Sequence, residues 1–387
     1  MFDIPNGALT IRTIHKQFCG PLFLSCFLAL TPPGHAEQTS ADVIAKLGIV
    51  ESDIPVSDMP GWKKPNAILV LIDGPGRLAW YQSELSERVK LIPAQNYRAA
   101  IQAISNNRAI ITAAVGFCDT DLLRASPNLH WLHMPYAGVE HCLSIPEVAQ
   151  GNYLITNMQK VAGPQIAEHV IAMMFYFARG LDHYADAQTQ RNWNQFAMPP
   201  SDLWSINGKT MLVAGLGGIG TATARLASDL GMKVIATRNS NRQGPAFVDY
   251  VGQPHELPDL VEKADVIVNA LPLTNSTRGL FNEDIFARMK SSSLFINVGR
   301  GSSVVTQDLI KALESGAIAG AGLDVQDPEP VPPTHPLWDA PNLLITPHIS
   351  SRNDSDRDIF WIIMRENLRR YVSGQPMLSV VDQAAGY

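Results

Sequence analysis

Short apolar runs alternate with longer amphipathic stretches along most of the chain. Such runs are typical of parallel strands that are buried on both faces, and the stretches between them, for example Asn96–Ser105, are typical of helices. This alternation predicts a parallel sheet that is covered by helices on both faces. We expect the strands of a first sheet at Asn66–Asp73, Val89–Ile92, Ala109–Ala113, Leu129–Met134 and Tyr153–Thr156.

A second alternating series follows Gln165–Arg179, a stretch that is apolar nearly all round and therefore predicts a helix buried between two domains. The order of its elements favours a second doubly wound sheet. The stretch Asp354–Tyr371 predicts a last helix that returns to the first domain. The sequence thus predicts an α/β protein with two doubly wound parallel-sheet domains. We expect the strands of the second sheet at Thr210–Ala214, Lys233–Thr237, Asp265–Leu271, Leu294–Val298, Gly320–Asp324 and Leu343–Ile345.

Composition narrows the classes of partner. The 387 residues carry a formal net charge of −6, so no bulk positive field exists to hold nucleic acid, and we expect no nucleic-acid partner. The four cysteines form no CxxC pair and no Cys/His spacing of a zinc site, so we expect no metal. Four cysteines are also too few for a disulfide scaffold at this length. An anionic substrate must therefore be held by local cations.

The N-terminus has the order of regions found in secretory signals. Arg12, His15 and Lys16 precede the apolar run Phe18–Leu30, and small residues follow up to Ala36. This order predicts a signal peptide at 1–36 and a periplasmic or secreted protein, with a cytoplasmic location as the alternative. The apolar run is too short for a good transmembrane helix, so we expect no transmembrane segment in the mature chain.

The second series opens on a glycine-rich turn of the form G-x-G-x-x-G, which follows a strand and begins a helix. In this setting the first glycine permits a tight turn, the second lets the backbone approach a pyrophosphate, and the third lets helix and strand pack closely. The free N–H groups of the helix N-terminus then face the phosphates. The expected cofactor-binding residues here are Gly215, Gly217, Gly218, Ile219 and Gly220.

The next strand ends at Arg238, where an NAD enzyme is expected to have an acidic residue for the ribose hydroxyls. A guanidinium suits a 2′-phosphate and cannot accept a hydrogen bond from a hydroxyl. Asn239 and Ser240 can donate to phosphate oxygens, and Arg242 would add charge. The sequence therefore predicts that NADP(H) is preferred and that NAD(H) is possible.

Three polar residues follow the ends of later strands, at the edge where open α/β sheets bind ligands. Arg300 lies in Asn-Val-Gly-Arg-Gly, Glu329 precedes Pro330, and His348 follows Thr-Pro. Arginine can hold a substrate carboxylate through two parallel hydrogen bonds. Histidine can donate a proton to a carbonyl oxygen as a hydride reaches the carbon, and a glutamate beside it would orient the ring and stabilise its protonated form. These three residues are the expected catalytic set.

From about Asn66 onward, the ordered motifs GLGGIG, LPLT with TRG, NVGRG, LDV…EP and TPH resemble the D-isomer-specific 2-hydroxyacid dehydrogenases, which include glyoxylate and hydroxypyruvate reductases. The resemblance implies a Rossmann cofactor domain at 166–345 inserted in a flavodoxin-like substrate domain at 37–165, to which 346–387 return. It implies a homodimer and a small 2-keto or 2-hydroxy acid as substrate. It also implies that the backbone of Ala137 and Gly138 helps Arg300 to bind the substrate carboxylate, and that further cofactor contacts come from Leu271, Pro272, Thr277, Val298 and Asp324.

Other members of the same fold are the alternatives. Formate dehydrogenases resembling this family carry glutamine in place of the glutamate, and phosphite dehydrogenases use a lysine in the loop that here reads MPYAGVEH; Glu329 and the absence of that lysine argue against both. A non-catalytic NAD(P)-sensing binding protein stays possible, because an intact Arg/Glu/His set does not exclude it. The sequence does not name the keto acid.

Overall fold

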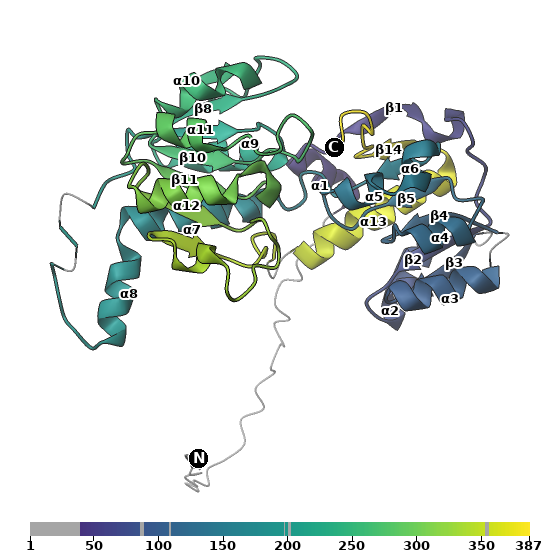
Figure 1. Ribbon diagram of the computed structural model, residues 1–387. Helices are drawn as coiled ribbons and strands as arrows, with labels where there is room; N and C mark the ends of the chain where they lie inside the picture. Colours follow the sequence, from purple (N-terminus) through teal and green to yellow (C-terminus); the bar gives the residue numbers. More distant parts are fainter. Residues whose placement is uncertain (1–38, 86–88, 108–109, 197, 200–202, 353–355) are drawn as a thin grey trace, which may run out of the picture. The chain divides into compact units, whose positions relative to one another are not determined.

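The first sheet of this computed structural model has five parallel strands in the order β3-β2-β4-β5-β6 (Figure 1). Side chains alternate between its faces, so Ile68 and Val70 pack in one apolar core while Ala67 and Leu69 pack in another. Both faces are buried, as the continuous apolar runs predict. The strands are β2 (Ala67–Leu71), β3 (Lys90–Ala94), β4 (Ile111–Val115), β5 (Trp131–His133) and β6 (Leu154–Thr156); the helices are α2 (Pro75–Gln82), α3 (Tyr97–Asn107), α4 (Thr120–Ala125), α5 (Glu140–Leu143) and α6 (Pro146–Gln150).

The structure describes residues 39–85, 89–107, 110–196, 198–199, 203–352 and 356–387. The signal peptide expected at 1–36 lies outside these residues. Residues 39–387 form one compact unit by their contacts. The boundaries of the domains stay a prediction.

Both ends of this unit join the first sheet. A two-stranded antiparallel sheet pairs β1 (Glu51–Pro55) with β14 (Pro376–Leu378), and helix α1 (Ser40–Leu47) packs on α13 (Asp356–Ser373). On α13, the Tyr371 ring stacks on Trp131 of β5 at 4.6 Å between centroids. The returning helix was expected from the sequence, whereas β1 and β14 are too short and too irregular in polarity to be expected.

The second sheet has seven strands in the order β13-β12-β11-β10-β7-β8-β9, and its pairs are parallel. The order reverses at β7, which lies between β10 and β8, and such a switch point is where open α/β sheets bind ligands. The edge strand β9 was not expected. The strands are β7 (Thr210–Ala214), β8 (Lys233–Thr237), β9 (Tyr250–Gly252), β10 (Val266–Asn269), β11 (Leu294–Asn297), β12 (Gly320–Leu323) and β13 (Leu343–Ile345).

The apolar helix expected at Gln165–Arg179 is α7 (Gly163–Ala178), which packs on α9 (Gly218–Asp229). It is followed by α8 (Leu181–Thr189), which has no buried residue. The remaining helices are α10 (Leu257–Val261), α11 (Glu283–Arg288) and α12 (Thr306–Glu314), and 3₁₀ turns lie at Val56–Asp58, Pro254–Glu256, Gly301–Ser303 and Pro336–Asp339.

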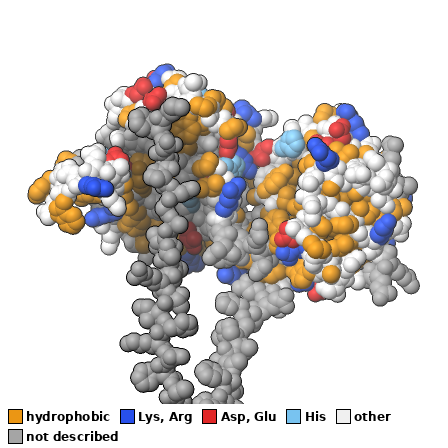
Figure 2. Space-filling view, turned by 90° about the horizontal axis from the view of Figure 1, so that it is seen from below, with side chains coloured by type: hydrophobic (Ala, Val, Ile, Leu, Met, Phe, Trp, Pro, Cys, Tyr) orange, Lys and Arg blue, Asp and Glu red, His pale blue; other side chains and the backbone are white. Residues whose placement is uncertain are grey.

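Three broader findings concern possible partners. None of the helices in the described residues is long and apolar enough to span a bilayer. Within those same residues, no three His, Cys, Asp or Glu side chains gather as a metal site would need. On the face drawn in Figure 2, basic and acidic side chains are interspersed and do not gather by sign.

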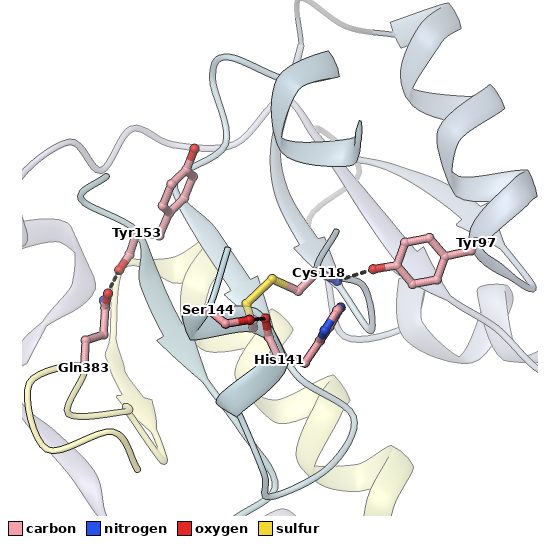
Figure 3. The surroundings of a disulfide bond; sticks show 7 residues. Tyr97, Cys118, His141, Ser144, Tyr153 and Gln383 are labelled. Carbon is pink, nitrogen blue, oxygen red and sulfur yellow. Dashed lines mark hydrogen bonds between the residues drawn. A yellow bond between two sulfur atoms is a disulfide. The ribbon is translucent and has the colours of Figure 1, made fainter. Parts of the chain in front are cut away.

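One disulfide, Cys118–Cys142, ties the loop after β4 to helix α5 (Figure 3). No motif in the sequence predicts that these two cysteines pair. The two cysteines are 24 residues apart in the sequence, and each lies in a segment that follows a strand of the first sheet.

Candidate active site

The glycine-rich turn lies between β7 and α9, at the switch point of the second sheet. Gly215 has φ +95°, a left-handed conformation that side chains rarely adopt, and a methyl group on Gly220 would overlap the carbonyl of Gly215. By contrast, a methyl group on Gly217 would meet nothing within 4 Å, and α9 begins without a side-chain cap. Tight packing at Gly215 and Gly220, together with an open backbone at Gly217, fits a pyrophosphate at the helix N-terminus.

Arg238 follows β8, as expected, and is half-buried. Its Nη1 donates to the carbonyl of Gln243 at 2.9 Å, and its own carbonyl accepts from Gln253 Nε2 at 3.1 Å, so the loop holds the residue in place. The neighbouring Asn239 and Ser240 are exposed. Within the described part of the chain, this guanidinium makes no second hydrogen bond.

Arg242 is engaged elsewhere. Its Nη2 lies 2.6 Å from Glu256 Oε1, and its Nη1 donates to the Tyr250 hydroxyl at 3.1 Å. The hydrogen bond from Arg242, followed by one from the Gln253 N–H, lowers the pKa of Glu256 to about 2. Arg242 was expected to add charge near Arg238, but Glu256 pairs with it and offsets much of that charge.

Arg300 follows β11 and reaches the loop that was expected to share the substrate carboxylate. Its Nε donates to Glu140 Oε1 at 2.8 Å, and its Nη1 donates to the carbonyl of Gly299 at 2.7 Å. A methyl group on Gly138 would overlap Nη2 of Arg300, so backbone and guanidinium are in contact there. Asn157 Nδ2 donates to the carbonyl of Ala137 at 2.6 Å and fixes the same loop.

His348 and Glu329 meet as the sequence suggested. His348 follows β13 in a left-handed conformation with φ 52°, and its Nδ1 lies 2.8 Å from Oε1 of Glu329. The His348 side chain is 51% exposed, and no hydrogen bond among the described residues engages its second nitrogen, Nε2.

Asp324 anchors the turn that carries His348. Its carboxylate accepts from Thr346 Oγ1 at 2.7 Å, from Ile349 N at 2.9 Å and from Ser350 N at 3.1 Å. Burial raises the pKa of Asp324, but these hydrogen bonds outweigh it, and the net pKa is lowered. His169 on α7 contacts the same group through Thr346 Oγ1 at 3.0 Å. Asp324 is fully buried and acts here as a support for the histidine turn.

The residues that were expected to line the cofactor also lie at or just after strand ends. Leu271 follows β10 and lies against Gly215, and a methyl group on Gly299 would come within 2.7 Å of the Leu271 carbonyl. Thr277 Oγ1 donates to the carbonyl of Pro272 at 2.7 Å, which closes the loop between them. Val298 follows β11 and is buried.

Strand register brings the catalytic set to one edge. Asn297 of β11 is level with Leu323 of β12, and Leu323 is level with Ile345 of β13. Arg300, Glu329 and His348 each follow one of these three neighbouring strands at its carboxyl end. The arrangement offers a cation for a carboxylate, a proton donor with an acidic partner, and a phosphate-binding turn two strands away.

Comparison with known proteins decides the family. Residues 171–350 match the family described as D-isomer specific 2-hydroxyacid dehydrogenase, NAD binding domain. A glyoxylate reductase of Thermofilum pendens is 30% identical over 288 residues, which are 73% of this chain and 84% of the relative. The chain belongs to the D-isomer-specific 2-hydroxyacid dehydrogenase family.

Further relatives of this D-2-hydroxyacid dehydrogenase agree. The human glyoxylate reductase/hydroxypyruvate reductase is 31% identical over 259 residues, 66% of this chain and 77% of the relative. A solved family protein from Aeromonas salmonicida is 31% identical, has a TM-score of 0.71 and covers 83% of this chain and 100% of its own. An NADPH-dependent glyoxylate/hydroxypyruvate reductase from Sinorhizobium meliloti, solved with NADP and sulfate, is 26% identical with a TM-score of 0.69, over 83% of this chain and 100% of its own. Fold class and family, as predicted from the sequence, are thereby confirmed.

Sequence reasoning missed two residues that contact the expected site residues. Glu140 binds Arg300, yet in the sequence it is an ordinary glutamate of a short helix. The backbone of Lys160 packs against the glycine-rich turn, because a methyl group on Gly218 would lie 2.8 Å from the Lys160 Cα. Each contact joins residues far apart in the chain, and no local signal marks it.

Proposed function

We propose that this dehydrogenase reduces a small 2-keto acid, glyoxylate or hydroxypyruvate, to the D-2-hydroxy acid with NADPH. The observation that carries the proposal is the pairing of His348 with Glu329 at the strand edge where Arg300 meets Gly138. Relatives of both names, from human and Thermofilum pendens, support the substrate class.

Each residue has a defined part in this reaction. The open backbone at Gly217 and the uncapped start of α9 fit the cofactor, which supplies a hydride to the carbonyl carbon when it is bound. Arg300 Nη2 and the Gly138 backbone hold the substrate carboxylate. His348 Nε2 donates the proton that the carbonyl oxygen needs, while Glu329 accepts from Nδ1 and keeps the ring oriented.

The preference for NADPH rests on Arg238, whose guanidinium keeps donors beyond its bond to Gln243. A carboxylate at this position would bind the ribose hydroxyls and repel a 2′-phosphate, and arginine has the opposite effect. The Sinorhizobium meliloti enzyme described as NADPH-dependent supports the same choice.

A homodimer and an exported protein complete the proposal. Trp193 and Phe196 beyond α8 are 92% and 77% exposed, which supports a second copy as their cover. The Cys118–Cys142 disulfide and the signal-like N-terminus support an oxidising compartment, with the cytoplasm as the alternative. Sedimentation of the purified protein tests the dimer, and N-terminal sequencing of native protein tests cleavage after Ala36; a monomer, or a cytosolic protein that keeps Met1, would contradict these two points.

One assay tests the function itself. NADPH oxidation is followed with glyoxylate, hydroxypyruvate and pyruvate, and the same set is repeated with NADH. We expect turnover of at least one of the first two and a higher kcat/KM with NADPH. Binding of NADPH without turnover of any keto acid would favour the non-catalytic sensor.

A further inference from the structure

Glu140 accepts a hydrogen bond from Arg300, the residue that is proposed to hold the substrate. Arginine has five N–H donors in a planar fork. In Arg300, the Nε donor is taken by Glu140 Oε1 at 2.8 Å, and one Nη1 donor is taken by the Gly299 carbonyl at 2.7 Å. Among the described residues, Nη2 has no hydrogen-bond acceptor. A substrate carboxylate is therefore left with the Nη edge of the guanidinium.

The place for that carboxylate is next to a second negative charge. The Gly138 backbone touches Nη2 of Arg300, and a methyl group built on Gly138 would lie 2.8 Å from Glu140 Oε2. A carboxylate held by Arg300 Nη2 and the Gly138 backbone thus has the Glu140 carboxylate as its neighbour. The Arg300 and Glu140 side chains are only 28% and 32% exposed, so water screens the pair incompletely.

Glu140 is held in this position by its short helix. An isolated helix of the four residues Glu140–Leu143 would not be stable, but Leu143 N donates to the Val139 carbonyl at 2.9 Å, and Cys142 is bonded to Cys118 (Figure 3). The loop before Gly138 is close enough to feel this charge. Burial, and after it the negative charge of Glu140, raises the pKa of Tyr136 in that loop. The carboxylate is therefore fixed near the substrate loop.

We propose that Glu140 is a specificity-determining residue, which restricts the site to keto acids that carry a single negative charge. The proposal rests on the proposed function of Arg300. Arg300 attracts one carboxylate, and Glu140 offsets much of the positive charge of Arg300, so little attraction is left for a second negative charge. A second negative charge on the ligand meets Glu140. At an effective dielectric between about 20 and 80, a like charge about 5 Å away weakens binding by roughly four- to 300-fold.

Oxamate and oxalate are the probes, because they are planar two-carbon acids of nearly equal size that differ by one negative charge. Their dissociation constants are measured by calorimetry on the full chain, with and without saturating NADPH. We expect the oxamate-over-oxalate preference of wild type to shift toward oxalate by about tenfold in Glu140→Gln. Glu147→Gln is the matched control, because Glu147 is a paired carboxylate that contacts Arg124 and not Arg300, and its preference should equal that of wild type.

Two further measurements separate charge from structure. Glu140→Asp keeps the charge and should keep the oxamate preference. Raising the salt concentration to about 1 M should change the preference of wild type more than that of Glu140→Gln. If the glutamine variant does not fold, Glu140→Ala takes its place in the binding measurements. An unchanged preference in Glu140→Gln, or an equal loss of preference in Glu140→Gln and Glu140→Asp, would overturn the proposal.

Turnover gives an independent readout. The ratio of kcat/KM for glyoxylate to that for the dianion ketomalonate should fall by about tenfold in Glu140→Gln. If wild type turns over no keto acid, the proposed function fails, yet the binding ratio of oxamate and oxalate still decides whether Glu140 selects by charge.

Discussion

Nδ1 of His348 lies 2.8 Å from Oε1 of Glu329, and this contact determines which nitrogen of the imidazole is left for the substrate. Because Nδ1 is engaged, Nε2 is the nitrogen that can donate a proton to a carbonyl oxygen. The turn that presents it is fixed from beneath, since His348 N donates to the Asp324 carbonyl at 2.9 Å. Ring orientation and backbone position are therefore controlled by separate residues.

Loss of the proton donor should slow the reaction strongly without weakening the binding of the cofactor. We expect His348→Asn to lower kcat by about 10²- to 10⁴-fold, the usual contribution of a general acid. Glu329→Gln keeps a carbonyl acceptor but loses the charge, so it should lower kcat by a smaller factor. Steady-state kinetics measure both effects, and fluorescence titration should give wild-type affinity for NADPH. Normal kcat in His348→Asn would contradict the assignment.

Arg300→Lys keeps the positive charge and loses the planar fork. The ammonium group of lysine cannot keep the bonds to Glu140 and the Gly299 carbonyl and also form two parallel hydrogen bonds to a substrate carboxylate. We expect kcat/KM for the keto acid to fall by an amount equivalent to about 2–4 kcal/mol. The affinity for NADPH serves as the internal control and should not change. An unaltered kcat/KM would exclude Arg300 as the carboxylate ligand.

Arg238→Asp should erase or reverse the preference for NADPH, because it removes the phosphate partner and installs an acceptor for ribose hydroxyls. In wild type we expect at least about a tenfold preference in kcat/KM, the size of one charge-assisted contact. Arg242→Gln is the matched control, since Glu256 already pairs with Arg242 and its loss should leave the preference nearly unchanged. Equal use of both cofactors by wild type would refute the assignment of Arg238.

The Cys118–Cys142 disulfide should stabilise the folded chain by restricting the unfolded one. Closing a loop of this length is worth about 3–4 kcal/mol in chain entropy. Cys142→Ser, or wild type in reductant, should therefore unfold at lower urea concentration than oxidised wild type, and reductant should have no further effect on the variant. Identical urea midpoints with and without reductant would show that the bond does not form in solution.

Acid should destabilise the protein through a buried histidine. Burial of His133 lowers its pKa from 6.5 to about 3, so the unfolded chain takes up a proton that the folded one refuses. The free energy of unfolding should thus fall as the pH drops below about 6.5, by up to about 1.4 kcal/mol per pH unit for this ring.

Urea unfolding between about pH 7 and pH 5 measures that slope. His133→Asn should reduce it, whereas the same change at the exposed His255 should not. Some slope should remain, because burial also lowers the pKa of His130. An equal slope in His133→Asn and wild type would contradict the prediction.

Much of this site could be read from the sequence because its signals are local. The glycine spacing from Gly215 to Gly220 encodes a turn, and Arg300 and His348 each follow an apolar strand directly. The bonds between distant residues could not be read, as Glu140 and Arg300 are joined only by the fold. The same holds for the neutralisation of Arg242 by Glu256 and for the pairing of Cys118 with Cys142. Strands β1 and β14 were missed because three to five residues with mixed polarity carry no period.

The antiparallel pairing of β1 with β14 has a consequence for synthesis on the ribosome. Every strand of the second sheet has been translated once Ile345 is made, whereas the apolar core on one face of the first sheet still lacks Tyr371 and β14, which follow later in the sequence. Domains generally fold as units while the chain emerges. The first sheet must therefore keep apolar surface uncovered on the ribosome until residues 371–378 have been made.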